Sequence, residues 1–300
     1  MKKVLLKISD SFGIDGGAEI TIEANPKTAN LQKLCDIRSL GINRLSIGMQ
    51  STHDPELKAL GRIHTFEDFC STYSDARRAG FDNISADLMY GIPNQTGDSF
   101  ARSVETLAGL DPEHISSYCL TIEEGTPFDR MRDKLILPDE DTVADMYSSL
   151  TDILEKHGYG KYEISNFAHK GYESRHNIKY WRLDDYLGFG PAAYSCFGGV
   201  RFGHTRDIEA YISGKNTYCE VCPTDRSEQM NEYVMLGMRL AEGINVSDFK
   251  ARFGEDFESR FGLKLKKYAP EHVYCDSLTY RFTKSGMFVS NFILSDVLDF

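Results

Sequence analysis

The sequence lacks any long run of apolar residues and any dense run of lysine or arginine. No apolar stretch reaches the roughly 20 residues that a helix needs to cross a bilayer. With 34 basic and 45 acidic residues, the formal net charge is −11, which disfavours attraction to nucleic acid or to an anionic membrane surface. Lys7 interrupts the apolar start and no small-residue cleavage site follows, so a signal peptide is not predicted. We therefore expect a cytoplasmic protein with no membrane span and no nucleic-acid partner.

A cysteine pattern typical of a disulfide framework or of a complete metal site is also missing. The seven cysteines, an odd number, are scattered over 300 residues and do not resemble a secreted disulfide framework. Cys219-Glu-Val-Cys222 has the spacing of metal ligands, but no second close pair completes a site, so a zinc or redox role has little support. The content of 41% hydrophobic and 26% charged residues is ordinary for a globular protein that buries one large core or two modest ones.

The first half of the chain repeats a unit of amphipathic helix, glycine stop and β-rich strand. Gly41, Gly80 and Gly158 each follow a basic residue in the last helical turn, as is typical of helix C-termini. The strands expected after them are 42–50, 84–88 and 162–165. This alternation predicts the α/β class and a βα-barrel.

Several expected strands run into a polar residue just before a turn. These residues are Glu23, Gln50, Asp87 and Thr121. Because helical stretches follow, the strands would be parallel and these side chains would gather at one rim, which is where βα-barrels bind ligands. The alternative is that each side chain merely caps a neighbouring helix.

Three parts are expected along the chain: a barrel at 1–170, a loop-rich connecting segment at 171–225 and a helical module at 226–300. The module should contain helices at 228–240, 246–253 and 284–298 and a β-like segment at 278–282. This order is typical of a winged-helix-like domain.

The connecting segment contains His176-Asn177-Ile-Lys-Tyr180-Trp181, with the only tryptophan of the chain. If the segment is helical, His176 and Tyr180 share one face. A neutral imidazole beside aromatic rings can ligate haem iron while the rings cover the macrocycle. The alternative is a histidine that packs and forms hydrogen bonds.

Taken in order, these motifs resemble the oxygen-independent coproporphyrinogen III oxidase family of radical SAM proteins, and within it the haem-chaperone branch. The matching motifs are Ile-Glu23-Ala-Asn-Pro, Arg44-Leu-Ser-Ile-Gly-Met-Gln50-Ser, Leu60-Gly-Arg62-Ile-His, Asp87-Leu-Met-Tyr-Gly-Ile-Pro93, Tyr118-Cys-Leu-Thr-Ile-Glu123 and the His176 segment. The family's C-x-x-x-C-x-x-C motif and its Gly-Gly-Gly-Thr-Pro strand end have no counterpart here. The resemblance thus implies a partial radical SAM βα-barrel without its first strands, followed by the small helical winged-helix-like domain.

The resemblance also implies cofactors. In the family, the positions that match Glu23, Gln50, Arg62, Asp87 and Gly91 contact S-adenosylmethionine, and the cysteine motif holds a [4Fe-4S] cluster. Reductive cleavage of the sulfonium needs that cluster, which thiolates must hold. Radical catalysis by this chain alone is therefore not expected, and whether the chain is an enzyme stays open.

The His176 motif marks the haem-chaperone branch, where its histidine is implicated in haem binding. The resemblance implies haem contacts at His176, Asn177, Tyr180 and Trp181, with His176 as the candidate ligand of the iron. The expected function is delivery of haem to an acceptor protein. An oxygen-independent coproporphyrinogen III oxidase and a degenerate fragment without a ligand are the alternatives.

A barrel without its first strands would also present the segment Glu19–Glu23 as an unpaired strand edge. Self-association through this edge is therefore expected.

Overall fold

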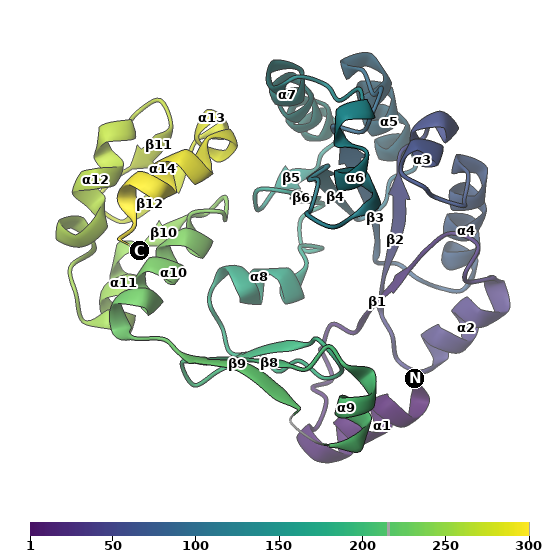
Figure 1. The fold of residues 1–300 in the computed structure, drawn as a ribbon, viewed down its shortest axis with the longest axis horizontal. Helices are drawn as coiled ribbons and strands as arrows, with labels where there is room; N and C mark the ends of the chain where they lie inside the picture. Colours follow the sequence, from purple (N-terminus) through teal and green to yellow (C-terminus); the bar gives the residue numbers. More distant parts are fainter. Residues whose placement is uncertain (215–216, 300) are drawn as a thin grey trace. The chain divides into compact units, whose positions relative to one another are not determined.

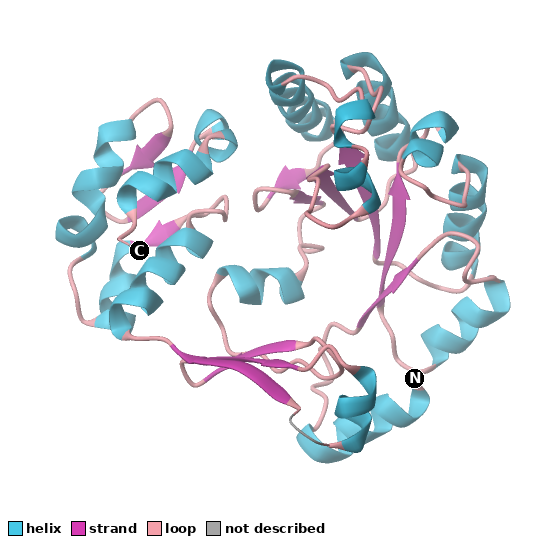
Figure 2. Cartoon of the chain, viewed as in Figure 1, coloured by secondary structure: helices cyan, strands magenta, loops and turns pink. Residues whose placement is uncertain are grey.

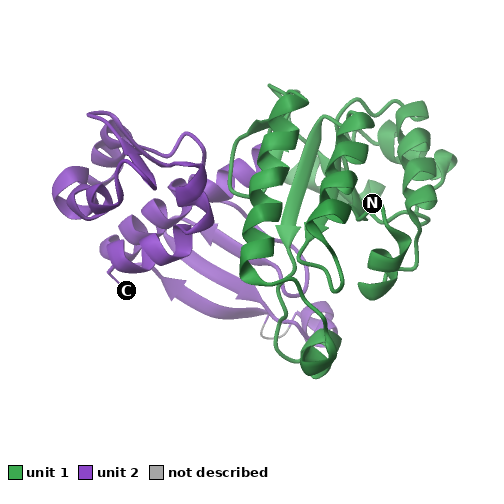
Figure 3. Cartoon of the chain, turned by 90° about the horizontal axis from the view of Figure 1, so that it is seen from above, with its two compact units in different colours: residues 1–173 green, residues 174–300 purple. Residues whose placement is uncertain are grey.

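The computed structural model describes residues 1–214 and 217–299. The chain forms two compact units, Met1–Glu173 and Ser174–Phe300 (Figure 3). Each unit contains both helices and strands, which Figure 2 colours cyan and magenta. The finer division of the second unit into a connecting segment and a helical module remains a proposal. Within the described residues, no helix has both the length and the apolar character that crossing a membrane requires.

The first unit is built on one mixed sheet with strand order β1-β2-β3-β4-β6-β5 (Figure 1). Strands β1 to β4 are parallel, β6 is antiparallel to β4, and β5 is antiparallel to β6. The elements are α1 (Lys2–Phe12), β1 (Thr21–Ala24), α2 (Leu31–Ser39), β2 (Arg44–Gln50), α3 (Asp54–Ala59), α4 (Phe66–Arg78), β3 (Ile84–Tyr90), α5 (Gly97–Gly109), β4 (His114–Cys119), α6 (Pro127–Arg130), a 3-10 turn (Arg132–Lys134), α7 (Glu140–Lys156), β5 (Gly160–Lys161) and β6 (Asn166–Ala168). The parallel strands with intervening helices confirm the predicted α/β class.

The prediction of a strand at 162–165 is wrong. This segment connects β5 to β6, which form a short antiparallel hairpin. The carboxylate of Glu163 accepts a hydrogen bond from the backbone N–H of Ser165 at 2.9 Å, and the N–H of Tyr162 donates to the carbonyl oxygen of Asn166 at 3.2 Å. These local bonds favour a turn over continued extension, and the apolar pattern of the segment does not reveal them.

The two faces of the sheet differ in polarity because side chains alternate along each strand. On β2, β3 and β4, one set is apolar and packs into the core with residues of α2, α4, α5 and α7: Leu45, Ile47, Ile84, Ala86 and Ile115. Fully burying one such aliphatic side chain stabilises the fold by about 1.5–3 kcal/mol. The residues between them form a polar face: Arg44, Ser46, Ser85, Asp87, His114 and Ser116.

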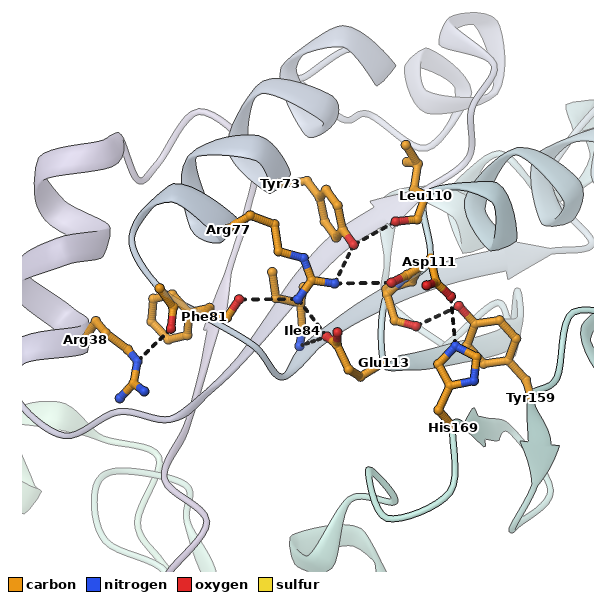
Figure 4. Close-up of polar contacts among 12 residues, drawn as sticks. Arg38, Tyr73, Arg77, Phe81, Ile84, Leu110, Asp111, Glu113, Tyr159 and His169 are labelled. Carbon is orange, nitrogen blue, oxygen red and sulfur yellow. Dashed lines mark hydrogen bonds and ion pairs between the residues drawn. The ribbon is translucent and has the colours of Figure 1, made fainter.

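A separate polar cluster holds the loops at the amino-terminal end of β3 and β4 (Figure 4). Arg77 donates to Glu113 Oε2 at 2.9 Å and to the carbonyl oxygen of Asp111 at 3.2 Å. The same Glu113 oxygen accepts from the N–H of Ile84 at 2.8 Å, and His169 contacts the Asp111 carboxylate at 2.9 Å. These contacts give the cluster a structural role at the amino-terminal end of the strands, whereas βα folds bind ligands at the carboxyl-terminal end.

The second unit starts with α8 (Arg175–Trp181) and an antiparallel sheet of order β7-β8-β9. Its elements are β7 (Tyr194–Phe197), β8 (Val200–His204), α9 (Ile208–Ser213) and β9 (Tyr218–Pro223). The loop-rich stretch predicted for 171–225 is therefore wrong in part, since three strands form here. Most residues of β9 are exposed, so the strand lacks the apolar and polar alternation that signals a half-buried strand.

The rest of the second unit is a small helical module around a three-stranded sheet of order β10-β12-β11. The elements are α10 (Arg226–Gly237), β10 (Ile244–Asn245), α11 (Val246–Phe253), a π-helical turn (Glu258–Gly262), α12 (Leu263–Leu265), a 3-10 turn (Lys266–Tyr268), β11 (Val273–Cys275), β12 (Thr279–Phe282), α13 (Lys284–Phe288) and α14 (Ser290–Val297). This order confirms the winged-helix-like domain. The helix expected at 284–298 is interrupted at Val289, which has non-helical dihedral angles (φ −97°, ψ 17°).

Candidate functional site: a polar sheet face and an aromatic helix face

Asp87 is the central carboxylate of the polar face in the first unit. It pairs in register with Gly48 of β2 and Ser116 of β4. Ser46 Oγ donates to Asp87 Oδ1 at 3.3 Å, and Ser116 also forms a hydrogen bond with the carboxyl group. The pKa of Asp87 is raised to about 6, because burial and, to a smaller extent, the nearby charge of Glu23 outweigh the two serine hydrogen bonds and Arg44, which lower it.

The four rim candidates do not all end their strands. Gln50 is the last residue of β2, but Asp87 is the fourth of seven residues in β3 and thus lies inside the sheet. Thr121 lies beyond Cys119, the end of β4, and is exposed. The expectation that all four share one rim is therefore corrected: the apolar run after Asp87 continues the strand to Tyr90 instead of starting a turn.

Gln50 has an unusual conformation at the end of β2. Its φ of 64° is left-handed, and the pairing with β3 shifts register between Gly48 and Gln50. The side chain folds back over Gly48, where a Cβ atom would lie 2.6 Å from Gln50 Nε2. Gln50 is only 5% exposed, and its Oε1 has no hydrogen-bond partner. An orphaned acceptor of this kind is suited to a ligand that donates a hydrogen bond.

The other two candidates lie in loops, Arg62 between α3 and α4 and Gly91 directly after β3. Arg62 is half-buried and donates to Asn25 Oδ1 at 3.1 Å, just after β1. Gly91 follows β3 with a φ of 75°, and a Cβ atom there would lie 3.2 Å from Cys119 Sγ. Nearby, His64 Nε2 contacts the carbonyl oxygen of Met49 at 3.3 Å, which supports the end of β2, and burial lowers the pKa of His64.

A buried carboxylate that the sequence analysis did not single out ties these loops together. Glu56 Oε2 accepts from Ser51 Oγ at 2.6 Å and from Gln95 Nε2 at 3.1 Å, and its Oε1 accepts from Ser99 Oγ at 2.6 Å. The loop that follows Gln50 at the end of β2 and the loop after β3, which carries Gly91, are thereby joined. No local pattern in the sequence marks Glu56, whereas the polar alternation of β2 and β4 could have revealed Ser46 and Ser116.

The two implied cofactors fit these residues differently. A polar face with the orphaned Gln50 Oε1, the Asp87 carboxylate and the Arg62 guanidinium offers the acceptors and the cation that S-adenosylmethionine requires. The cluster does not fit. Within residues 1–214 and 217–299, no three His, Cys, Asp or Glu side chains come close enough to hold a metal, and all seven cysteines are free.

The second candidate site is on α8. Ser174 caps the helix by accepting a hydrogen bond from the N–H of Asn177 at 3.3 Å. The rings of His176 and Tyr180 lie 4.9 Å apart at 86°, and the ring of Tyr186 follows 4.5 Å from Tyr180 at 67°. His176 and Tyr180 are exposed. The helix therefore presents an imidazole and a phenol ring together at its surface.

The environment of Trp181 differs from that of His176 and Tyr180. The guanidinium of Arg239, in the turn after α10, lies over its ring at 5.7 Å, and its buried Nε1 has no hydrogen-bond partner. Trp181 also lines a cavity of about 540 Å³ whose other walls come from α10, β10 and α11. The end of α8 is held there by an ion pair between Arg182 and Glu242 at 2.9 Å.

Arg252 of α11 completes this attachment. It donates to the carbonyl oxygens of Arg182 and Leu183 at 3.1 and 2.8 Å, which satisfies acceptors at the C-terminus of α8. Trp181 lies on a different face of α8 from the pair His176 and Tyr180, because it is five positions after His176 and one after Tyr180.

Comparison with known proteins adds family evidence. The model of the Radical SAM superfamily matches residues 1–107, and the HemN C-terminal domain matches residues 224–288. The structure is similar to coproporphyrinogen III oxidase HemN from Escherichia coli, with a TM-score of 0.82 over 98% of this chain and 73% of that one. At 22% identity this likeness shows the fold alone.

Curated relatives are nearer in sequence. Heme chaperone HemW of Bacillus subtilis is 37% identical over 84% of this chain and 68% of its own length. Heme chaperone HemW of Lactococcus lactis is 32% identical over 99% of this chain and 81% of its own length. A mouse relative, radical S-adenosyl methionine domain-containing protein 1, is 38% identical, and the match spans 58% of that protein. The chain belongs to the HemW family of the radical SAM superfamily.

Proposed function

We propose that this chain binds haem at the exposed face of α8 and passes it to an acceptor protein, as the name of its HemW relatives describes for them. The observation that carries the proposal is the pair His176 and Tyr180, whose rings stand at 86° to one another on an exposed helix surface. A cytoplasmic location, as expected from the sequence, is part of the same proposal.

The angle between these two rings suits a haem ligand. An imidazole that ligates iron stands upright on the porphyrin, because the iron–nitrogen bond lies in the imidazole plane. A ring perpendicular to that imidazole can lie parallel to the porphyrin and cover part of it by stacking. Exposure of both rings also suits a chaperone, since the ligand must leave again for its acceptor.

The proposal for the first unit is that Glu23, Gln50, Arg62, Asp87 and Gly91 contact S-adenosylmethionine. Asp87 and Glu23 would accept hydrogen bonds from hydroxyl or amino groups, Arg62 would pair with the carboxylate, and Gly91 would let the backbone approach the adenine. With a reduced cluster, this cofactor supplies a carbon radical by sulfonium cleavage. Among the described residues, no three His, Cys, Asp or Glu side chains come together to hold a metal, so we favour a binding role for the first unit over oxidase activity.

Haem binding and release can be measured in one experiment. The purified chain is titrated with haemin, and the Soret band is followed until saturation; apomyoglobin is then added in excess. We expect one haem per chain with an altered Soret band, followed by transfer to myoglobin. A measured spectrum equal to the sum of the spectra of free haemin and protein, with no saturation, would contradict the proposal. Saturation without transfer to myoglobin would contradict the delivery step and indicate a haem carrier that does not release its ligand.

A further inference from the structure

The row of rings at the surface of α8 extends beyond the His176 motif. Tyr186, five residues after the end of the helix, lies 4.5 Å from Tyr180 at an interplanar angle of 67°. Tyr180 in turn stands against His176. Trp181, although it lies within the motif, packs beneath Arg239 instead. The aromatic neighbour that touches Tyr180 is therefore Tyr186.

Tyr186 is fixed by the neighbouring sheet. Its N–H donates to the carbonyl oxygen of Cys196 on β7 at 2.8 Å, and its own carbonyl oxygen accepts from the N–H of Cys196 at 3.0 Å. Two residues later, the N–H of Gly188 donates to Ser195 Oγ at 3.0 Å. The loop that carries Tyr186 is thereby bound to β7 at two consecutive points, and Tyr186 is half-buried.

The side chain of Tyr180 is held less firmly by its own helix than Tyr186 is by β7. It lies in the last turn of a seven-residue helix and is 36% exposed. An exposed aromatic side chain on such a helix can change rotamer unless a neighbour restrains it. The edge contact with Tyr186 supplies this restraint, and burial of the Tyr180 hydroxyl beside Tyr186 raises its pKa.

We propose that Tyr186 is a positioning residue for haem, acting through Tyr180: it holds the phenol ring perpendicular to the imidazole of His176, so that the ring is ready to stack on the porphyrin. This inference rests on the proposed haem site at His176. By the same geometry, Trp181 does not contact haem and instead anchors α8 to α10 and the cavity beside it. Pre-ordering a binding side chain raises affinity because less freedom is lost when the ligand binds.

The test is a double-mutant cycle on haemin affinity. Tyr186→Leu removes the ring but leaves the two backbone bonds to Cys196, and we expect about tenfold weaker binding, of the size that one ordered aromatic contact supports. The Soret maximum should not move, since His176 still ligates the iron. Tyr186→Phe should restore wild-type affinity, because the edge contact needs the ring and not the hydroxyl.

Tyr180→Leu combined with Tyr186→Leu should bind no more weakly than Tyr180→Leu alone, because Tyr186 acts through Tyr180. Tyr274→Leu, at an exposed tyrosine of β11 in the same unit, is the matched control and should keep the wild-type affinity. Circular dichroism checks the fold of each variant, and Tyr186→Met replaces Tyr186→Leu in the cycle if the latter does not fold.

Losses that add in the double variant, or wild-type affinity of Tyr186→Leu, would overturn the inference. If His176→Ala abolishes binding while Tyr186→Leu does not change it, only this inference fails. If the wild-type chain does not bind haemin, or binds it as well without His176, the proposed function fails and the inference with it.

Discussion

Ser46 on β2 donates a hydrogen bond to the carboxylate of Asp87 on the neighbouring strand β3, at 3.3 Å. The pair lies on the polar face of the sheet, opposite the face that packs against the helices. A second serine, Ser116 on β4, also bonds to this carboxylate. Asp87 therefore accepts hydrogen bonds from both neighbouring strands. Its pKa is still raised, because the effect of burial is larger than that of the two hydrogen bonds.

Asp87→Asn should make the fold more stable at high pH. The pKa of Asp87 is raised from 3.8 to about 6, so the folded state binds more protons than the unfolded state between these values. Stability therefore falls as pH rises from about 4 to 6 and then stays level. The amide avoids this penalty, and the gain above pH 7 should be at most about 3 kcal/mol for a shift of roughly two units.

Urea unfolding between pH 4 and pH 8 measures this effect. The stabilisation by Asp87→Asn should grow across that range and be nearly absent at pH 4. Asp82→Asn, at an exposed position, is the control and should leave the profile unchanged. A constant difference between wild type and Asp87→Asn at all pH values would show that Asp87 does not titrate as the structure indicates.

Glu56→Ala should destabilise the first unit by about 2–4 kcal/mol, because Ser51, Gln95 and Ser99 lose a buried acceptor. Glu67 is exposed on α4, and Glu67→Ala should stay within about 0.5 kcal/mol of wild type. Denaturant unfolding followed by circular dichroism compares the two. Equal free energies of unfolding for Glu56→Ala and Glu67→Ala would contradict the prediction and mean that water satisfies Ser51, Gln95 and Ser99 when Glu56 is removed.

Much of the fold could be predicted from the sequence where one local signal dominates. The helix expected at 246–253 coincides with α11 because Asn245 caps its start and Gly254 ends it in the left-handed conformation. Strands β2 and β3 were found from their glycine stops and apolar content. The hairpin of β5 and β6 was missed because its strands have two and three residues.

The candidate site was predicted in part. The residues were recognised from motifs, but Asp87 was placed near a strand end, since the sequence does not show that Met89 and Tyr90 continue β3 beyond Leu88. The contact between Tyr180 and Tyr186 depends on the bridge from Tyr186 to Cys196, which joins segments ten residues apart. Pairings of this kind depend on tertiary structure, and local patterns do not specify them.

Reconstitution with iron and sulfide should yield no stoichiometric cluster, because the seven cysteines are free and no three ligands converge in the part of the chain that the structure describes. The measurement is iron analysis after anaerobic reconstitution, together with a dithionite-driven assay for deoxyadenosine. Four iron atoms per chain with deoxyadenosine formation would refute this prediction.

The chain should self-associate through β1. This strand is at the end of the sheet order, pairs with β2 alone among the described strands, and has exposed residues at Thr21 and Glu23. Such an edge can pair with another copy. Light scattering should report concentration-dependent association that Thr21→Lys reduces, since a charge on an edge strand opposes pairing. A monodisperse monomer at high concentration would be inconsistent with this prediction.

The most direct test of haem binding is titration of His176→Ala with haemin beside the wild-type chain. His272→Ala is the matched control, because His272 lies in the same unit and bonds to Ser285 Oγ at 3.1 Å rather than to an aromatic ring. We predict that His176→Ala binds haemin at least about tenfold more weakly and loses the shifted Soret band, since an axial ligand sets the spectrum of the iron, whereas His272→Ala keeps both. Wild-type affinity and spectrum in His176→Ala would contradict the account and leave His176 as a surface packing residue.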